Sequence, residues 1–460
     1  MQAVRKLNTQ EMALPFPPKT AGFPLIGSIP NLVKKQVDYL VDAWREYGDI
    51  YTLDLGIMQI VVVNHPDYAQ YVLRDAWRNY GKGGEMWDSI RTLIGDGLVT
   101  AEGEVWRRNR RMMQPHFHRQ HLAGLSQLML EAINDGMADW DALAESGESF
   151  DISKAFSKVT MKVITRTMFG SAMSAEEADK MGVELSFAVR YLMQLMVTDK
   201  VPKWIPVPGR KRYQEVLDYF NNFLYSVIER RRREPDQSGD LLAMMLNMVD
   251  EETGHQMTDK EIRDEAATIF AAGYETTSVA MSWAVHMLSQ HPDIAYKLQE
   301  SVDTTLNGAA PSFENFMQLV YPRMVMEETM RLYPPAYQYT RQAIEDDVMG
   351  GYRIKAGQMV FVVPLTIQRH PDFWEHPTKF DPQRFAPEAA VGRHPLAFMP
   401  FGAGQRQCIG KDFAMMEGIF ILTKLAQRYH IHADPTHEAK PGLAATLSPK
   451  DGVWVRLEKR

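Results

Sequence analysis

The chain reads Phe401-Gly402-Ala403-Gly404-Gln405-Arg406-Gln407-Cys408-Ile409-Gly410, and this stretch contains the only cysteine among 460 residues. Gly402 and Gly404 can adopt backbone conformations closed to other residues and let the chain approach a ligand closely. The apolar run that follows predicts a helix, and the N-terminus of a helix stabilises a thiolate. Arg406 can pair with a carboxylate of the bound group, and Gly410 leaves room for a flat one. Together these features suit Cys408 as an axial ligand of haem iron.

The pattern Phe-Gly-x-Gly-x-Arg-x-Cys-x-Gly resembles the signature of the cytochrome P450 family of haem-thiolate monooxygenases at every fixed position. The resemblance implies a mainly α fold with a small β-rich part and a single domain that binds one haem b. It implies that Cys408 is the proximal iron ligand and that Arg406 contacts a haem propionate. Phe401 is expected to pack beside the sulfur, with Gly402 and Gly410 in the same cofactor-binding loop.

The bulk properties fit a globular protein of a reducing compartment. The composition is 45% hydrophobic and 24% charged, and the formal charge of -7 argues against a nucleic-acid partner. A single cysteine forbids an internal disulfide, so we expect a cytoplasmic protein. We also expect a monomer whose one domain spans residues 1–460, with an extended, polar and proline-rich segment at 1–20. No segment is apolar enough to cross a membrane, as in the family's soluble, mostly bacterial members.

A second distinctive segment predicts a long interior helix. Thr258 and Glu261 have the capping-box spacing of a helix start, and helical spacing continues to about His291, before Pro292. The helix is largely apolar and should therefore cross the interior.

The middle of this helix carries the residues with chemical potential. Glycine costs about 1 kcal/mol relative to alanine inside a helix, so Gly273, next to Ala272, should leave room above a flat cofactor. A hydroxyl at Thr276 can bond a helix carbonyl. The sequence matches the family pattern Ala-Gly-x-Glu/Asp-Thr, which implies that Glu275 and Thr276 are catalytic and manage proton delivery during oxygen activation.

Two further sites are expected to hold haem propionates. Trp106 and Arg110 lie one turn apart on a predicted helix and share a face. The resemblance implies that this pair, and Arg341 on a later strand, bind the haem propionates. Three arginines on other faces of that helix could dock an acidic electron donor or could simply face solvent: Arg107, Arg108 and Arg111.

Glu328 and Arg331 are three residues apart on a helix that Pro334 ends, so they can pair. The resemblance implies that Arg384 joins them in a buried structural triad. The alternative is a surface ion pair worth about 0–1 kcal/mol.

The resemblance implies substrate contacts from the Gly81–Val99 segment, which we interpret as an irregular loop, and from a lid of two helices at 176–197 and 210–233. The long helix is expected to contribute further contacts. These segments are mostly apolar, which suits a lipophilic molecule such as a fatty acid, terpenoid, steroid or polyketide. The candidate contacts are Trp87, Ile90, Leu192, Met193, Ile269, Ala272 and Tyr337.

The resemblance implies insertion of one oxygen atom from O2, by hydroxylation or epoxidation, with two externally supplied electrons. The chain after Cys408 is too short for a flavin reductase domain, so we expect a separate ferredoxin, flavodoxin or reductase as the redox partner. One alternative is an H2O2-dependent peroxygenase, which typically lacks the acid–alcohol pair present at Glu275 and Thr276. Another is a haem-thiolate sensor, which would need neither a threonine at the oxygen site nor a large lid.

Overall fold

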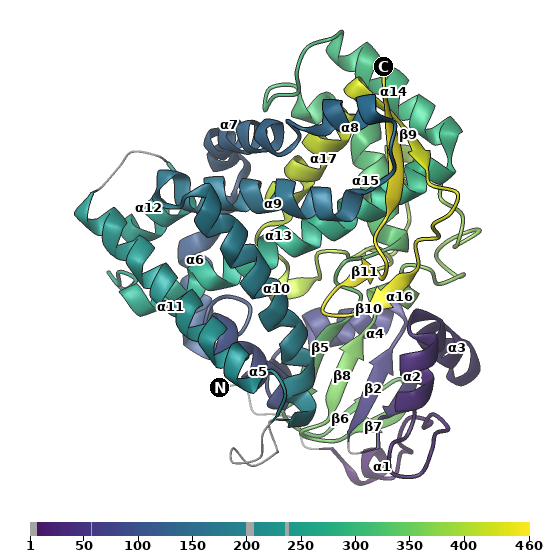
Figure 1. The fold of residues 1–460 in the computed structure, drawn as a ribbon. Helices are drawn as coiled ribbons and strands as arrows, with labels where there is room; N and C mark the ends of the chain where they lie inside the picture. The colour runs from purple at the N-terminus through teal and green to yellow at the C-terminus, as the bar shows by residue number, and fades with distance from the viewer. Residues whose placement is uncertain (1–6, 57, 199–206, 235–238) are drawn as a thin grey trace. The chain divides into compact units, whose positions relative to one another are not determined.

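The computed structural model describes residues 7–56, 58–198, 207–234 and 239–460 (Figure 1). The chain divides into two compact units. The first unit comprises Met1–Gly84, Glu327–Cys408 and Pro441–Leu443. The second unit comprises Glu85–Met326, Ile409–Lys440 and Ala444–Arg460. A single domain over the whole chain stays a prediction.

The first unit is built on a five-stranded sheet in the order β1-β2-β8-β5-β3. Its strands are β1 (Ile50–Asp54), β2 (Gln59–Val63), β3 (Tyr80–Gly81), β5 (Tyr339–Ala343) and β8 (Met359–Val362). β1 and β2 form an antiparallel hairpin, with Leu53 opposite Ile60. β8 runs parallel to β2, with Val61 opposite Val360, so segments far apart in sequence share one sheet. Buried β-branched side chains favour these strands.

Short helices and a second hairpin complete the first unit. They are α1 (Thr9–Met12), α2 (Ile29–Lys35), α3 (Val37–Tyr47), α4 (Pro66–Gln70), α16 (Pro364–Ile367) and the β6–β7 pair (Asp347–Met349 with Tyr352–Ile354). The extended segment expected at 1–20 is wrong in part, because α1 forms there. The Asn8 side chain accepts a hydrogen bond from the Glu11 backbone N–H, and the Asn8 backbone N–H donates to the Glu11 carboxylate. Together these two bonds form a complete capping box.

The second unit is mainly helical. Its helices are α5 (Glu85–Ile94), α6 (Gly103–Met113), α7 (Arg119–Gly136), α8 (Trp140–Ser146), α9 (Ile152–Phe169), α10 (Ala175–Thr198), α11 (Arg210–Arg233), α12 (Leu241–Asn247), α13 (Asp259–Gln290), α14 (Pro292–Leu306) and α17 (Lys411–Arg428). α15 (Val320–Leu332) links the two units in sequence.

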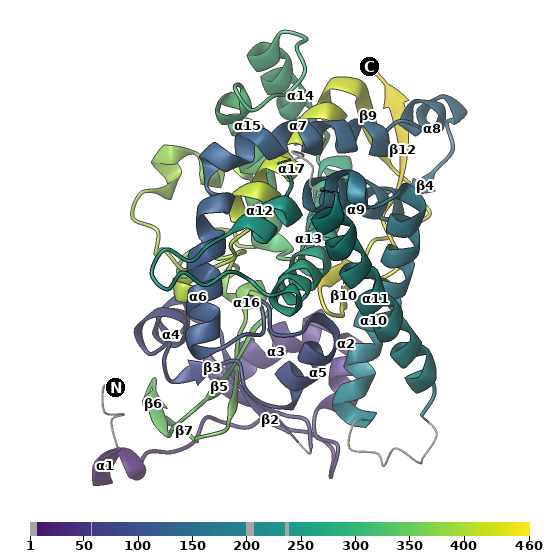
Figure 2. The same cartoon turned by 90° about the vertical axis from the view of Figure 1, so that its left-hand side faces the viewer.

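α13 is the central helix of the second unit. It packs against α5, α9, α11 and α17, and Figures 1 and 2 show these helices around it. The Thr258 side chain caps its first turn with Glu261 in the predicted capping box. The helix ends at Gln290, and Pro292 begins the next one, as expected.

One expectation about the second unit needs correction. The segment Gly81–Val99 is not irregular throughout, because α5 occupies its middle. Apolar side chains recur there every three to four residues at Trp87, Ile90 and Ile94, and that period is helical.

The second unit also contains a three-stranded sheet. Its strand β4 (Phe150–Asp151) pairs with β12 (Trp454–Lys459), and β12 in turn pairs with β9 (Tyr429–Ala433).

Candidate active site

Cys408 closes a tight loop of the first unit and is exposed. Its backbone N–H donates to the Phe401 carbonyl at 2.9 Å, which folds the loop back on itself. Three residues later α17 begins, with Gly410 as its N-cap. Free cysteines are usually buried, so an exposed thiol at a helix entrance is a ligand geometry rather than a packing one.

Gly402 and Gly404 of this loop both have a positive φ, and each lies close to another part of the first unit. Gly404 has a φ of +69°, and a Cβ there would lie 2.0 Å from the Leu73 carbonyl oxygen. Gly402 has a φ of +71°, and its N–H donates to the Tyr339 hydroxyl at 2.8 Å. That hydroxyl donates to the Met399 carbonyl at 2.6 Å. Sequence reasoning missed Tyr339, which fixes the loop from a neighbouring strand.

The expected propionate ligands of the first unit lie on the same unit as Cys408. Arg341 is buried on β5, and its guanidinium donates to the Thr340 carbonyl at 2.8 Å. Arg406 is half-buried in the cysteine loop. Tyr337, an expected substrate contact, is buried just before β5, and burial raises the pKa of its phenol to about 12.

The predicted structural triad assembles in the first unit. The Arg331 guanidinium donates to both oxygens of Glu328, at 2.6 and 2.8 Å, and both side chains have an exposed fraction of 0%. Arg384 lies 3.5 Å from the same carboxylate. Arg331 also donates to three backbone carbonyls, those of Gln368, Pro377 and Lys379. The surface-pair alternative is therefore wrong.

The middle of α13 is open although the helix is otherwise buried. Residues 262–268 and 277–285 are buried without interruption, whereas Ile269, Gly273, Glu275 and Thr276 are half-buried and Ala272 is exposed. These residues recur every three to four positions, so they share one side of the helix. This open side is where the sequence placed the cofactor and the catalytic pair.

Thr276 forms the predicted bond, and Gly273 has a packing role that the sequence did not indicate. The Thr276 hydroxyl donates to the Ala272 carbonyl at 2.8 Å, one turn back in the same helix. A Cβ on Gly273 would lie 2.8 Å from the Ile164 side chain of α9. The glycine therefore permits close packing of α9 on α13.

Glu275 is held from outside its own helix. The Thr446 hydroxyl donates to its carboxylate at 2.9 Å. Burial raises the pKa of Glu275, while the bond from Thr446 and the positive charge of Arg190 oppose that rise. A carboxyl group with a raised pKa suits proton transfer near neutral pH.

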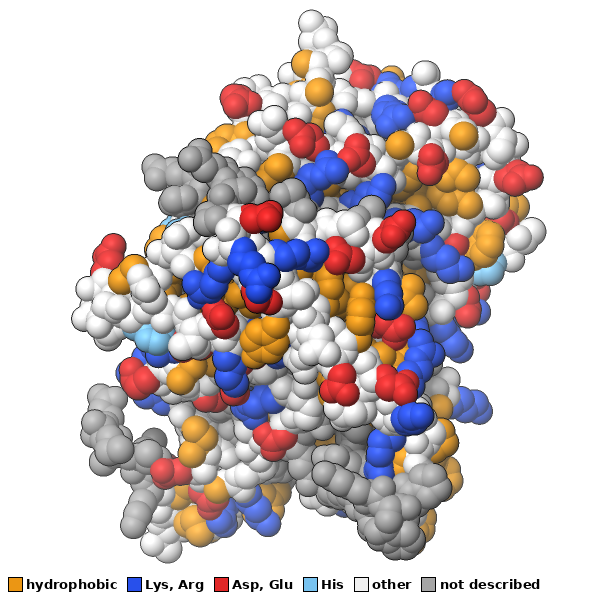
Figure 3. All heavy atoms as spheres, turned by 60° about the vertical axis from the view of Figure 1, so that its left-hand side comes forward, with side chains coloured by type: hydrophobic (Ala, Val, Ile, Leu, Met, Phe, Trp, Pro, Cys, Tyr) orange, Lys and Arg blue, Asp and Glu red, His pale blue; other side chains and the backbone are white. Residues whose placement is uncertain are grey.

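The other expected propionate ligands lie on α6. Trp106 is buried, and Arg110 is half-buried with its Nε donating to the Gln114 side chain at 3.1 Å. The three neighbouring arginines all form ion pairs within the second unit: Arg107 with Glu104, Arg108 with Glu261, and Arg111 with Asp250. Figure 3 likewise shows basic and acidic side chains interspersed on one face. These pairs weaken the interpretation of the three arginines as a basic docking surface.

The remaining substrate candidates come from two helices of the second unit. Trp87 is buried and Ile90 half-buried on α5, and Leu192 is buried on α10. The Met193 side chain lies outside the described part of the chain.

The second unit also contains two buried, hydrogen-bonded acids that the sequence did not single out. Glu265 of α13 accepts from the Leu98 backbone and the Asn109 amide, both at 2.9 Å, and burial raises its pKa to about 7. Glu417 of α17 has a bond from Thr277, and burial raises its pKa to about 8. The signal available in the sequence was an acid within an apolar helical face.

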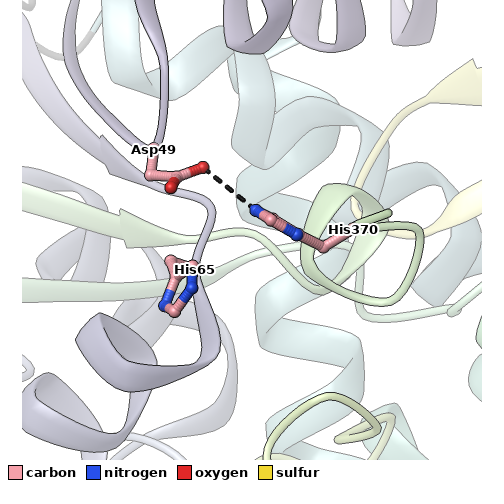
Figure 4. A group of neighbouring side chains, drawn as sticks. All are labelled: Asp49, His65 and His370. Carbon is pink, nitrogen blue, oxygen red and sulfur yellow. Dashed lines mark hydrogen bonds and ion pairs between the residues drawn. The ribbon is translucent and has the colours of Figure 1, made fainter. Parts of the chain in front are cut away.

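A polar cluster in the first unit resembles a metal site but is arranged as a hydrogen-bond network. Ligand atoms of Asp49, His65 and His370 lie within 4.8 Å of one another (Figure 4). Nδ1 of each histidine accepts a backbone N–H two residues on, at 3.2 and 3.3 Å. The rings therefore carry their protons on Nε2, and His370 can donate to Asp49 at 3.3 Å. A metal-bound histidine usually donates its other N–H instead.

Each unit, taken by itself, presents residues that suit a haem. The first unit supplies an exposed thiol in a loop fixed by Tyr339, together with the cationic Arg341 and Arg406. The second unit supplies a buried helix with one open side that carries a hydroxyl and an acid. A thiolate ligand, cations for carboxylates and an uncovered apolar face are the groups that haem-thiolate binding requires.

Comparisons with known proteins agree with this interpretation. The family description "Cytochrome P450" matches residues 17–453. Pentalenene oxygenase of Streptomyces avermitilis is 29% identical, covering 95% of this chain and 96% of the relative. Cyclooctatin synthase of Streptomyces melanosporofaciens is 30% identical, covering 91% of each chain.

A solved structure of the haem domain of cytochrome P450DA superposes with a TM-score of 0.88 at 26% identity, covering 97% of this chain and 98% of that one. Among the described residues, no helix is long and apolar enough to cross a membrane. From its cysteine signature, its fold and these matches, the chain belongs to the cytochrome P450 family of haem-thiolate monooxygenases.

Proposed function

We propose that this monooxygenase binds haem b through Cys408 and oxidises a terpenoid-like hydrocarbon with O2 and two electrons from a separate redox partner. The observation that carries the proposal is the open side of α13, where Thr276 and Glu275 stand in an otherwise buried helix. When bound, the haem would supply the activation of oxygen. The protein residues would then hold the cofactor, orient the substrate and deliver protons.

The cofactor-holding roles follow the donors that the two units present. Cys408 would ligate the iron, since its thiol is the only one in the chain. The candidate propionate ligands are Arg341 and Arg406 in the first unit, and Trp106 and Arg110 in the second. Each offers N–H donors of the kind that carboxylates bind most strongly.

Thr276 and Glu275 would divide the proton work. The Thr276 hydroxyl can release its bond to the Ala272 carbonyl and present its proton on the open side of α13. Glu275, with a pKa raised by burial, can take a proton from solvent and pass it inward. The presence of this pair favours O2-dependent turnover over the peroxygenase alternative.

The terpenoid assignment rests on two observations. The proteins similar to this chain include a pentalenene oxygenase and a cyclooctatin synthase, both from Streptomyces. The candidate substrate contacts that the structure describes are apolar or aromatic: Trp87, Ile90, Leu192, Ile269, Ala272 and Tyr337. A hydrocarbon skeleton gains affinity from such a lining, whereas a charged ligand would need a buried partner.

The test is reconstituted turnover. The haem-loaded protein is supplied with NADPH, a ferredoxin and a ferredoxin reductase, and challenged with cyclic sesquiterpenes, cyclic diterpenes, fatty acids and steroids. We expect a ferric spin shift and one oxygen atom from 18O2 in the product for a cyclic terpene. Oxygenation of fatty acids or steroids alone would contradict the substrate class. Equal product from H2O2 without donors would favour the peroxygenase.

A further inference from the structure

Glu275 has a partner that neither the sequence pattern nor the proposed activity assigns. Its carboxylate is not bonded to the adjacent Thr276, whose hydroxyl is engaged with Ala272. Instead it accepts a bond of 2.9 Å from Thr446, which lies 171 residues away in sequence. The acid and the alcohol of the pair are thus held by different parts of the second unit.

Thr446 is itself held firmly in place. It is buried, and its carbonyl accepts from the Ala444 N–H at 3.2 Å in a tight turn. The next residue, Leu447, is fully buried, and its carbonyl accepts from the Trp283 indole at 2.6 Å. Trp283 lies on α13, so the segment that presents the hydroxyl is anchored to the helix that carries Glu275. The bond is therefore not a chance surface contact.

The chemistry of this bond matters for proton transfer. A hydroxyl that donates to a carboxylate stabilises the ionised form and selects one orientation of the side chain. Three influences act on Glu275: burial favours the neutral acid, while Thr446 and the more distant Arg190 favour the carboxylate. Tyr274, the neighbouring titratable group, has its own pKa raised to about 12 by burial and stays neutral. Thr446 is thus the direct hydrogen-bond contributor to the charge of Glu275.

We propose that Thr446 is a positioning residue for catalysis, which orients the Glu275 carboxyl group and favours its ionised form, so that Glu275 can take up and deliver protons consumed with O2. This proposal rests on the proposed role of Glu275. Without the hydroxyl, the acid would be free to rotate and would hold its proton more tightly. Electrons would then be diverted from product to peroxide, because proton delivery to the open side of α13 would no longer be matched to the supply of electrons.

The test compares Thr446→Val, which removes the hydroxyl at nearly constant shape, with Thr446→Ser, which retains it. Thr423→Val is the matched control, because the Thr423 side chain is fully buried and its hydroxyl has no hydrogen-bond partner among the described residues. Glu275→Gln identifies the carboxyl signal in infrared difference spectra recorded against pH. This titration needs no turnover and therefore does not depend on the loaded enzyme's activity.

We expect the Glu275 carboxyl of Thr446→Val to titrate at higher pH than in the unaltered protein, with the serine variant and the Thr423→Val control unchanged. In turnover, Thr446→Val should give about 3- to 10-fold less product per NADPH, with a normal spin shift; the effect is below the roughly 10²–10⁴-fold contribution of a whole acid–base group because Glu275 itself remains. An unshifted titration and unchanged coupling would overturn the proposal. Normal coupling in Glu275→Gln would overturn the role of Glu275. A failure of every variant, and of the unaltered protein, to oxygenate any substrate would instead contradict the proposed function.

Discussion

The Glu328–Arg331 pair of the first unit and the middle of α13 in the second unit both place polar groups inside the protein, but they use them in opposite ways. Arg331 has an acceptor for each of its five N–H groups, and Glu328 also accepts from the Asp381 backbone. On α13, Thr276 bonds only back to its own helix, and Ala272 beside it is exposed.

The difference separates a structural site from a reactive one. Buried polar groups normally have hydrogen-bond partners, so polar groups with unused hydrogen-bonding capacity inside the fold call for an explanation. The Glu328–Arg331 pair has none left and can only hold its region together. The α13 residues keep a hydroxyl, an acid and an open side, which is what a site needs to accept a cofactor, a substrate and protons.

The largest effect should come from breaking the satisfied pair. Glu328→Gln leaves the Arg331 charge buried without a counter-ion, and we expect a loss of about 3–5 kcal/mol of unfolding free energy. Chemical denaturation measures it, with Asp135→Asn as the control. Asp135 forms a surface pair with Arg166 at 2.7 Å, so that variant should lose only about 0–1 kcal/mol. Equal losses in both variants would erase the contrast.

The next effect is a pH dependence of stability from the second unit. Burial raises the pKa of Glu265 from 4.5 to about 7, so its contribution is fully present below pH 4.5 and is lost as pH rises through about 7. The loss corresponds to roughly 3 kcal/mol. Denaturation between pH 5 and 8 should show this decline, and Glu265→Gln should flatten it. A slope identical in both proteins would contradict the assignment.

A smaller effect, on turnover rather than stability, should follow from Thr276→Ala. Alanine suits a helix interior, so stability should change by less than about 1 kcal/mol, while product per NADPH falls about tenfold or more. Thr276→Ser should retain most of the coupling. The measurement is product formed against NADPH and O2 consumed. Normal coupling in the alanine variant would show that the open side of α13 has no proton role.

The smallest effect should appear in the cysteine loop. A Cβ at Gly402 would meet nothing closer than the Tyr339 ring at 3.8 Å, so Gly402→Ala carries only the strain of a positive φ, about 1 kcal/mol. Gly404→Ala should cost more, because its Cβ would lie 2.0 Å from the Leu73 carbonyl. Thermal unfolding of the haem-loaded variants orders the two. The reverse order would mean that the loop is not fixed as described.

Local sequence signals were enough to predict several helices and one ion pair, whereas features that depend on long-range contacts could not be predicted. The Thr258 capping box and Pro292 were enough to delimit α13, and α11 lies at its predicted bounds of 210–233. The Glu328–Arg331 spacing predicted their pairing. α5 was missed because glycines flank a short apolar period.

The sequence could not reveal contacts that join distant segments. Thr446 bonds Glu275 across a sequence separation of 171 residues, and the sequence around either residue gives no indication of this contact. The packing role of Gly273 was missed for the same reason, since Ile164 of α9 approaches it from another part of the chain. Residue type indicated which side chains can do chemistry, but the directions in which they point depend on packing.

The most direct test of the central claim, that Cys408 is a thiolate ligand of haem iron, is the absorption spectrum of the dithionite-reduced, CO-bound protein. We predict a Soret band far to the red of that of a His-ligated haem, and Cys408→His should move it to the ordinary position. A band at the His-haem position in the freshly folded, unaltered protein, or no haem band at all, would contradict the account.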